Sequence, residues 1–439
     1  MTPAALSFSA KSKRTPESPI SYYMAHALDN PALISLAAGF VDGAALPITP
    51  IARAVEKLLA DPRTARAALQ YGTTQGHGPL RDKVLQHVRQ LDGQMPSAAT
   101  SADVVITTGS QQLLCLLADI LFDEGDIVIT EAPSYFVYHS VLASNGVRVL
   151  TVPMDDDGMK TDELARLLQR LEIEGLLPRV KLIYVVDYFQ NPSGRTMTPV
   201  RRQQLFDLVR NYEQKQRILI LEDAAYRELR FEGDDWPSLF SMDAAHRFVV
   251  YAGTFSKPCA PGLKTGYAIL PRELVEPILR LKGNHDFGSN NLSQYVIDAL
   301  LANGDYQKHV EYLRGSYRHK RDAMMRALER EFSDLPGTHW THPRGGLFVW
   351  LTLPAHIRTG PTGTLIEAAI HEGVLYIPGE FGHVDEEGPR PTNEMRLSYG
   401  DASVEQIDEG ICRLRRAVDR VGSQRHSPEP ANELAGASA

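Results

Sequence analysis

Short runs rich in β-branched residues alternate with amphipathic segments through the middle of this chain, and that alternation restricts its fold more than any other feature. Seven such runs span residues 104–107, 127–130, 147–152, 181–186, 217–222, 248–252 and 266–270. Longer segments of helical periodicity separate most of them. The rhythm predicts an α/β fold in which helices flank a mostly parallel, seven-stranded sheet. Because only a loop joins the last two runs, one antiparallel strand is expected there.

A chain of 439 residues is too long for one ordinary core, so two domains are expected. We predict a large domain over 46–290 and a smaller α+β domain over 291–421 that opens with one long helical pattern, 292–333. Residues 1–45 are expected to form an N-terminal arm that completes the small domain. The small and polar residues 422–439 indicate a disordered tail.

Composition excludes several classes of protein. A net charge of −8 has the opposite sign to the face that a nucleic-acid binder requires. No apolar run approaches the roughly 20 residues of a membrane span, and the N-terminus lacks the apolar core of a secretory signal. Cys115, Cys259 and Cys412 form no zinc or disulfide pattern. We therefore expect a soluble cytoplasmic protein with no metal site, no nucleic-acid partner and no membrane contact.

Polar residues stand where several predicted strands end, at the sheet edge where open α/β proteins bind ligands. After the first run, Gly109, Ser110 and Gln111 open a helix whose free N–H groups can seat a phosphate. Tyr135 follows the second run and a Pro-Ser turn, where its ring can stack on a planar ligand. Taken alone, an ordinary capped turn and a core tyrosine are the simpler interpretations.

Asn191, Asp223 and Tyr226 follow two further strands in the same way. Asn191 lies in an Asn-Pro-Ser-Gly turn that has a structural explanation of its own. Asp223 is harder to explain structurally, because a carboxylate directly after an apolar strand costs free energy unless a cationic or protonated group meets it. Lys257 ends the next strand, where apolar neighbours would lower its pKa and make its neutral amine a nucleophile. A solvated surface lysine is the alternative.

In this order, the groups match the requirements of pyridoxal 5′-phosphate (PLP). The phosphate needs an anion seat, the ring a stacking partner, and the 3′-oxygen hydrogen-bond donors. The pyridine nitrogen needs an acid that keeps it protonated, and the aldehyde needs an amine. The sequence therefore predicts PLP as the cofactor.

The chain resembles the class I/II aminotransferases of PLP fold type I from about residue 18 to 420. The subgroup that it most resembles contains the 2-aminoadipate, kynurenine and aromatic aminotransferases. The matching motifs are LQYGTTQGHGPLR (69–81), TTGSQQ (107–112), EAPSY (131–135), FQNPSG (189–194), EDAAYREL (222–229), GTFSKPCAPGLKTGY (253–267), PRGGLFVWL (343–351) and MRLSYG (395–400). Several motifs in a fixed order make this match specific.

The resemblance implies a role in cofactor binding for each matching residue. Lys257 would form a Schiff base with PLP and move a proton through a quinonoid intermediate. Asp223 would pair with the pyridine nitrogen, while Tyr135 would stack on the ring. Asn191 and Tyr226 would hydrogen-bond the 3′-oxygen. The remaining residues implied to hold the phosphate are Ser110, Gln111, Thr254, Ser256 and Lys264, together with Tyr71 reaching across a homodimer interface.

The resemblance also implies how the substrate is bound. Arg396 would grip the α-carboxylate, for which its planar fork is suited. Gly39 and Asn191 would lie close to the substrate. Separately from the resemblance, Tyr22 and Tyr23 in the arm, with Phe40 beside Gly39, are candidates for an apolar side-chain pocket, and the alternative is that they only pack the small domain. Ser289 and Asn290 would border the same subunit seam as Tyr71.

This sequence departs from the family pattern in three places. Lys264 stands where arginine is usual, so a point charge replaces a fork. Asp187 and Tyr188 precede FQNPSG, where many relatives have a proline-containing turn, and they are candidates to line the pocket. Ser21 replaces a frequent arginine of the covering arm, so the family alone does not identify the substrate.

The leading hypothesis is transfer of an amino group from an L-amino acid with a bulky, aromatic or aminoadipate-like side chain to a 2-oxo acid, with 2-oxoglutarate expected. A second hypothesis keeps PLP but changes the reaction to β-elimination, decarboxylation or oxidation. A third is a ligand-sensing domain of a transcription regulator. The third is disfavoured by the negative charge and by the short segment ahead of the resemblance.

Overall fold

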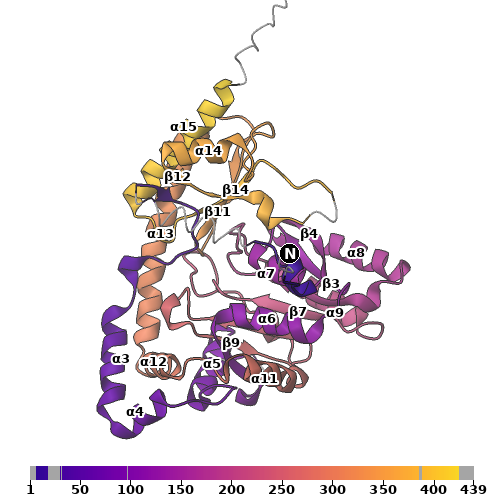
Figure 1. Cartoon of the computed structure of the whole chain (residues 1–439), viewed down its shortest axis with the longest axis vertical. Coiled ribbons are helices and arrows are strands. Elements are labelled where there is room, and N and C mark those ends of the chain that lie inside the picture. Colours follow the sequence, from indigo (N-terminus) through magenta and orange to yellow (C-terminus); the bar gives the residue numbers. More distant parts are fainter. Residues whose placement is uncertain (1–5, 18–29, 31, 96, 385–387, 425–439) are drawn as a thin grey trace, which may run out of the picture.

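The computed structural model describes residues 6–17, 30, 32–95, 97–384 and 388–424. Its largest sheet has eight strands in the order β2-β9-β8-β7-β6-β3-β4-β5 (Figure 1). The strands are β2 (Val104–Thr107), β3 (Ile127–Ala132), β4 (Arg148–Asp155), β5 (Gly158–Met159), β6 (Val180–Val185), β7 (Leu219–Asp223), β8 (Val249–Thr254) and β9 (Gly266–Ile269). All seven predicted runs form strands, which confirms the α/β fold. The eighth strand, β5, is a two-residue edge strand antiparallel to β4.

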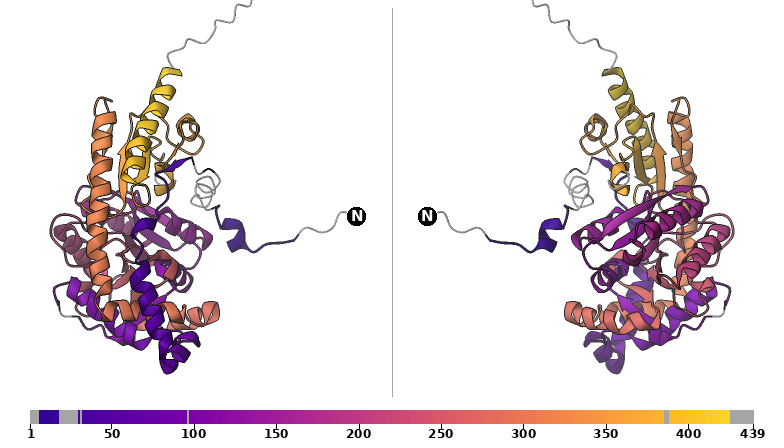
Figure 2. Two further views of the ribbon diagram at one scale, coloured as in Figure 1. Left: turned by 90° about the vertical axis from the view of Figure 1, so that its left-hand side faces the viewer. Right: turned by 90° about the vertical axis from the view of Figure 1, so that its right-hand side faces the viewer.

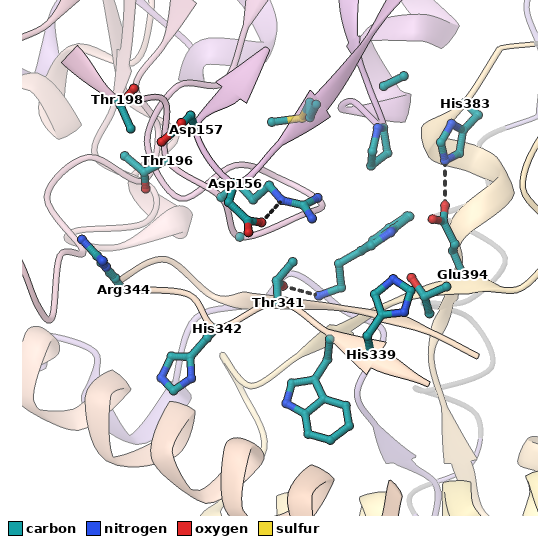
Figure 3. A pocket seen from close by; sticks show the side chains of 18 of the residues that line it. Asp156, Asp157, Thr196, Thr198, His339, Thr341, His342, Arg344, His383 and Glu394 are labelled. Carbon is teal, nitrogen blue, oxygen red and sulfur yellow. Dashed lines mark hydrogen bonds and ion pairs between the residues drawn. The ribbon is translucent and has the colours of Figure 1, made fainter. Parts of the chain in front are cut away.

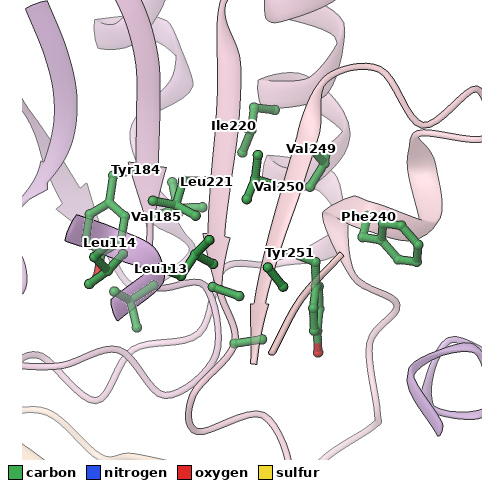
Figure 4. Close-up of a cluster of buried hydrophobic side chains, with 14 of the residues drawn as sticks. Leu113, Leu114, Tyr184, Val185, Ile220, Leu221, Phe240, Val249, Val250 and Tyr251 are labelled. Atoms are coloured by element: carbon green, nitrogen blue, oxygen red, sulfur yellow. The ribbon is translucent and has the colours of Figure 1, made fainter. Parts of the chain in front are cut away.

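Strands β3, β4, β6, β7 and β8 run parallel, whereas β9 is antiparallel to both of its neighbours, β2 and β8. This confirms the antiparallel strand that the short connection predicted. The central strands are buried along their whole length, which explains their continuous apolar sequences. Figure 4 shows their side chains packed beside Leu113 and Leu114 of α6 (Gly109–Leu121).

The helices around this sheet fall into three groups by their mutual contacts. One group consists of α6, α7 (Phe136–Ser144) and α11 (Arg272–Asp286). A second consists of α8 (Thr161–Ile173), α9 (Pro199–Tyr212) and α10 (Leu239–Met242). A third set packs against the β2 edge and contains α3 (Ile48–Ala60), α4 (Pro62–Leu69), α5 (Gly78–Leu91) and α12 (Asn291–Ala302). Together these elements bury the first hydrophobic core.

A second core surrounds a four-stranded antiparallel sheet, β10 (His339–Trp340), β11 (Phe348–Thr352), β14 (Glu394–Ser398) and β13 (Ile377–Pro378). Helices α13 (Asp305–Phe332), α14 (Thr364–Glu372) and α15 (Val404–Gln424) cover it. From the N-terminal segment, β1 (Ile34–Ser35) joins this core by pairing in parallel with β12 (Val374–Leu375). From β1 onwards, the chain therefore starts and ends in the same core.

The single helix predicted over 292–333 is wrong, because the structure divides it into α12 and α13. The break lies at Gly304, whose φ of 77° is left-handed, and the Asn303 side chain accepts a hydrogen bond from the Asp305 N–H. Helix α13 then runs past both cores (Figure 2), with Val310 in the first and Met324 in the second. The domain boundary expected at residue 290 stays a prediction.

The N-terminal helix α1 (Ala10–Arg14) lies against α7. Two ion pairs fasten it to the first core, Lys11 to Asp119 at 2.6 Å and Arg14 to Glu124 at 2.7 Å. Among the described residues, no helix combines the length and the apolar character needed to cross a membrane.

Candidate active site

A cavity of about 170 Å³ lies at the carboxyl ends of the central strands. Its lining brings together every predicted cofactor-binding residue except Tyr71. These are Ser110, Gln111, Tyr135, Asn191, Asp223, Tyr226, Thr254, Ser256, Lys257 and Lys264. The rule that ligand sites lie at strand ends therefore places these side chains together across more than 150 residues of sequence.

The first wall of the cavity is the start of α6. The residue before the helix, Thr108, supplies no side-chain cap, so the first N–H groups of α6 are left for an anion. Strand β9 passes directly beneath this turn at Gly266. A Cβ atom there would lie 2.6 Å from the carbonyl carbon of Gly109 and 2.7 Å from the Ser110 nitrogen. Only glycine permits this approach.

Hydroxyl groups and one lysine complete this anion seat. The Thr254 hydroxyl donates to Ser256 Oγ at 3.0 Å, at the end of β8. Lys264 ends a short 3-10 helix, Pro261–Leu263, in a left-handed conformation with φ of 47°. Its side chain is exposed yet lines the cavity.

Asp223 ends β7 and is buried. Its carboxylate accepts hydrogen bonds from the Tyr184 hydroxyl at 3.0 Å and from the Ala225 N–H at 3.2 Å. Burial raises the pKa of Asp223 to about 6, while the bond from Tyr184 opposes that rise. Tyr184, in the middle of β6, was not predicted from the sequence. A hydroxyl-bearing side chain in an otherwise aliphatic strand was the only signal.

Lys257 projects into the same cavity from the loop after β8. Its Nζ donates to the Gly39 carbonyl at 2.8 Å, so the N-terminal segment does lie close to this amine. Burial, together with the positive charges of Arg396 and Lys264, lowers the pKa of Lys257 to about 8. The Lys257 amine therefore loses its proton at a lower pH than an ordinary lysine does.

Arg396 approaches the cavity from β14 of the second core. Its Nη1 donates to Asn191 Oδ1 at 2.8 Å and its Nη2 to the Ala37 carbonyl at 2.7 Å. The guanidinium stacks 4.3 Å from the centre of the Phe348 ring. Burial lowers the pKa of Arg396 to about 10. Its Nε, which is also buried, has no hydrogen-bond partner among the described residues.

Neutral polar side chains surround these charges. Asn191 Nδ2 donates to the Tyr226 hydroxyl at 3.3 Å, and the Tyr135 hydroxyl approaches Gln111 Oε1 at 3.5 Å. Burial raises the pKa of both tyrosines above the usual range, so each keeps its proton as a donor. Their hydroxyl groups and the Asn191 amide thus offer several donors to one ligand.

Four predicted site residues do not line this cavity, and two of them, Arg396 and Gly39, reach it only through their hydrogen bonds with Asn191 and Lys257. Tyr71 is 87% exposed and borders a surface hollow of about 580 Å³ with Phe287, Ser289 and Asn290. Its ring centre lies 6.4 Å from that of Phe287. Tyr22 lies outside the described residues.

The prediction that Asp187 and Tyr188 line the pocket is wrong. Both are buried away from the cavity, because the chain turns back under the sheet after β6. Asp187 forms an ion pair with Arg202, and the guanidinium of Arg202 stacks 4.0 Å from the Tyr188 ring.

A larger cavity of about 790 Å³ separates the two cores and contains none of the predicted site residues (Figure 3). His339, Trp340 and His342 line one wall, and Asp156 and Asp157 the other. A search for the site by cavity size alone would therefore have missed every predicted site residue.

The charges around the smaller cavity fit PLP and an amino acid. Asp223, Lys257 and Arg396 are buried or half-buried, and within the described part of the chain none of them has an oppositely charged partner at ion-pair distance. A protonated pyridine nitrogen, an aldehyde and an α-carboxylate would meet these three groups in turn. The uncapped start of α6 would leave N–H groups free to bind the phosphate.

Comparison with known proteins identifies the family. Residues 31–414 match the family described as aminotransferase class I and II. Aromatic-amino-acid aminotransferase 1 of Thermococcus litoralis is 36% identical over 388 residues, covering 88% of each chain. The 2-aminoadipate transaminase of Thermus thermophilus is 34% identical, over 88% of this chain and 90% of its own. The crystal structure of Pyrococcus horikoshii kynurenine aminotransferase superposes with a TM-score of 0.86 at 32% identity, over 94% of this chain and 97% of its own.

The family match, the relatives and the fold agree with one another and with the residues around the cavity. This chain belongs to the class I and II aminotransferases, the PLP-dependent transferases of fold type I.

Proposed function

We propose that this aminotransferase takes the amino group of an L-amino acid with a bulky, aromatic or aminoadipate-like side chain and gives it to a 2-oxo acid, with 2-oxoglutarate as the acceptor. The observation that carries the proposal is the meeting of Asp223, Lys257 and Arg396 around one cavity without charged partners. Support for the substrate class comes from the aromatic-amino-acid and 2-aminoadipate enzymes, to which the chain is similar.

When bound, PLP supplies an aldehyde that takes up the amino group and a conjugated ring that accepts the electrons released at Cα. Asp223 would hold the proton on the ring nitrogen, with Tyr184 keeping its carboxylate in place. Tyr135 would stack on the ring, and Asn191 and Tyr226 would donate to the 3′-oxygen. The phosphate would be bound by Ser110, Gln111, Thr254, Ser256 and Lys264.

Lys257 would anchor the aldehyde and, once released, remove the proton from Cα of the amino acid. With a pKa of about 8, its amine is substantially neutral at mildly alkaline pH and so is available as a base. The same Nζ would then deliver that proton to the aldehyde-derived carbon. Both transfers stay on one side chain, which shields them from water.

Arg396 would bind the α-carboxylate of the amino acid and of the oxo acid through its free donors. Because Phe348 stacks on its guanidinium and Asn191 and Ala37 fix two of its N–H groups, the side chain is already oriented. Gly39 and Phe40 lie on the same segment as Ala37, and we assign them, with Tyr22 of the arm, to the substrate pocket.

We also propose a homodimer, in which Tyr71 of one subunit reaches the phosphate seat of the other. Tyr71, Phe287 and Leu69 are large apolar side chains that are all more than 60% exposed around one hollow, as expected for a surface that a second copy covers. The mass of the holoenzyme in solution tests this assignment.

A panel of amino donors tests the function. Each L-amino acid is mixed with the holoenzyme alone, and the cofactor absorbance is followed through one half-reaction. Tyrosine, phenylalanine, kynurenine and 2-aminoadipate are expected to react at least tenfold faster than alanine or aspartate, and 2-oxoglutarate to restore the starting spectrum. Reaction with small donors only would contradict the substrate class. Release of ammonia or carbon dioxide without a 2-oxo acid would contradict transamination itself.

A further inference from the structure

Behind the cavity, on the far side of β7 from Asp223, lies a group of five charged side chains that the reaction does not use. They are Asp92, Asp187, Arg202, Glu222 and Arg227, each no more than 3% exposed. They come from the end of α5, the turn after β6, α9, β7 and the turn after β7. We call them the buried charge cluster.

One ion pair of the buried charge cluster, Arg227 with Asp92, is electrically neutral without the other members. Arg227 Nη2 lies 2.6 Å from Asp92 Oδ1. The other oxygen of Asp92 accepts from the Ser238 hydroxyl, and Oδ1 accepts also from the Ser238 N–H, both at 2.8 Å. Asp92 is therefore an ionised acceptor, and its charge cancels that of Arg227.

The rest of the cluster contains two carboxyl groups and one guanidinium. Arg202 Nη1 lies 2.5 Å from Asp187 Oδ2 and 3.6 Å from Glu222 Oε1. If both acids were ionised, one uncompensated negative charge would be buried here at a large cost in free energy. A single retained proton removes that cost, because it leaves one carboxylate for one guanidinium.

Hydrogen bonding leads to the same conclusion. The two oxygens of Glu222 accept from the N–H groups of Leu239 at 2.9 Å and Phe240 at 2.8 Å. Apart from the Arg202 guanidinium, no donor among the described residues hydrogen-bonds an oxygen of Asp187. Asp187 Oδ2 and Glu222 Oε1 face the same Nη1 of Arg202, and two ionised carboxylates cannot donate to one another.

We propose that Asp187 and Glu222 share one proton in the folded enzyme, so that the buried charge cluster is electrically neutral behind Asp223. No bond other than an O–H bond is involved, because the pair keeps one proton that a free carboxyl group would release to solvent at neutral pH. Burial raises the pKa of Asp187, and burial together with the charge of Asp187 raises that of Glu222. The charged and titratable groups that face the pair are Arg202, Arg227, Tyr188, Tyr251, Glu131 and Asp223.

The consequence for catalysis rests on the proposed role of Asp223, whereas the shared proton does not. A negative charge on Asp187 raises the pKa of Asp223, beyond the larger effect of burial. The shared proton removes that extra charge, so Asp223 stays ionised and able to face a protonated ring nitrogen. Asp187 is thereby a positioning residue, because sharing its proton keeps an extra negative charge away from Asp223.

Infrared difference spectroscopy in H₂O and D₂O tests the shared proton, because a protonated carboxyl group has a carbonyl stretch that shifts on deuteration. The holoenzyme at pH 7 is compared with Asp187→Asn, which keeps the shape of the side chain and removes the acid. One protonated-carboxyl band is expected to disappear. An unchanged set of bands would overturn the proposal.

Glu131→Gln is the matched control. Burial raises the pKa of Glu131 to about 8, so it contributes a protonated carboxyl of its own next to the cluster. This variant is expected to lose a different band and to keep the one that Asp187→Asn removes. Because Glu131→Gln leaves Asp187 and Glu222 intact, it also serves if Asp187→Asn fails to fold. No protonated-carboxyl band at pH 7 in Glu131→Gln would equally overturn the proposal.

Two further measurements separate neutrality from mere packing. The affinity of Asp187→Asn for PLP at pH 7 should match wild type within twofold, since the net charge is the same, and a tenfold change would contradict a neutral pair.

The stability of the fold, in contrast, should differ between wild type and Asp187→Asn in its dependence on pH. A raised carboxyl pKa stabilises the fold at acid pH, and this contribution is lost as pH rises through the pKa of the pair. The wild-type unfolding constant should thus increase more steeply with pH than that of the variant, by up to tenfold per pH unit.

Discussion

Two sets of buried charges lie on opposite sides of β7, and they differ in whether their charges are matched. Behind the strand, Arg202 and Arg227 each have a carboxylate partner within 2.6 Å. In front of it, Asp223, Lys257 and Arg396 bond only to neutral groups, a tyrosine hydroxyl, a backbone carbonyl and an amide. Burying these three charges lowers the stability of the fold, because no charged group in the described protein neutralises them.

The difference separates architecture from function. Matched charges stabilise the fold that already exists, whereas unmatched charges are stabilised only when a ligand arrives. Enzymes arrange such groups to meet the charge of the reacting molecules. Variants of the two sets should therefore fail in different ways.

Lys257→Ala should have the largest effect. The aldehyde would lose its anchor and the Cα proton its carrier, because Lys264, the other lysine of the cavity, is assigned to the phosphate, so transamination should fall by at least about 10⁴-fold. The visible absorbance of the lysine-bound cofactor should disappear as well. Lys308→Ala, at an exposed position on α13, is the control and should behave as wild type. Normal turnover by Lys257→Ala would refute the assignment of this lysine.

Arg227→Met should break the matched set and spare the reaction. It leaves the Asp92 carboxylate buried without its cation, which typically lowers the free energy of unfolding by about 3–5 kcal/mol. Thermal unfolding monitored by circular dichroism measures the loss. The KM for the amino donor should stay within about threefold. If unfolding were unaffected, the contrast between the two sets would be lost.

Arg396→Lys should do the reverse. The point charge of lysine cannot reproduce the planar fork, so kcat/KM should fall about 100-fold, equivalent to the roughly 1.5–3 kcal/mol of charged hydrogen bonds. The melting temperature should change less than in Arg227→Met, because Arg396 has no carboxylate partner to abandon. A larger loss of stability than of activity would place Arg396 in the matched set.

Tyr184→Phe should shift a pH dependence. Asp223 has a pKa of about 6 in the cofactor-free protein, so PLP affinity should decline as pH falls through that value and the carboxylate is protonated. The Tyr184 hydrogen bond lowers this pKa. Its removal should therefore move the decline to higher pH and weaken PLP binding about fivefold at pH 7, as expected for roughly 1 kcal/mol. Titration of the apoprotein with PLP from pH 5 to 8 measures both, and an unshifted profile would contradict the contact.

Lys264→Arg should have the smallest effect. Arginine offers a fork where lysine offers a point charge, so PLP affinity should be preserved or rise by a few fold. Fluorescence titration of the apoprotein measures it. A large loss of affinity would mean that the exposed Lys264 side chain does something other than contact the phosphate.

The sequence predicted the strands and the residues at their ends because both depend on local signals. An apolar run fixes a strand, and a parallel strand carries the residue after it to the same edge as its neighbours. That argument placed Asn191, Asp223 and Lys257 around one cavity. Arg396 and Tyr71 came from the family resemblance, since nothing local distinguishes them.

The misses depend on geometry that no single segment contains. Tyr184 meets Asp223 because β6 and β7 pair with Tyr184 opposite Leu221, and that register is a property of two strands. Asp187 also follows a strand, but the chain turns back there towards Arg202 on α9. The break between α12 and α13 was hidden because the apolar periodicity continues across Gly304.

The absence of a side chain at Gly266 determines what substitutions at this position would do. The anion seat belongs to α6, but its height above the sheet is set by a residue in β9, whose backbone touches the helix start. Even a methyl group there would lift the first turn of α6 away from the hydroxyls of β8. Substitutions at this position are therefore expected to displace the anion seat relative to Lys257, although residue 266 contributes no side chain to the cavity.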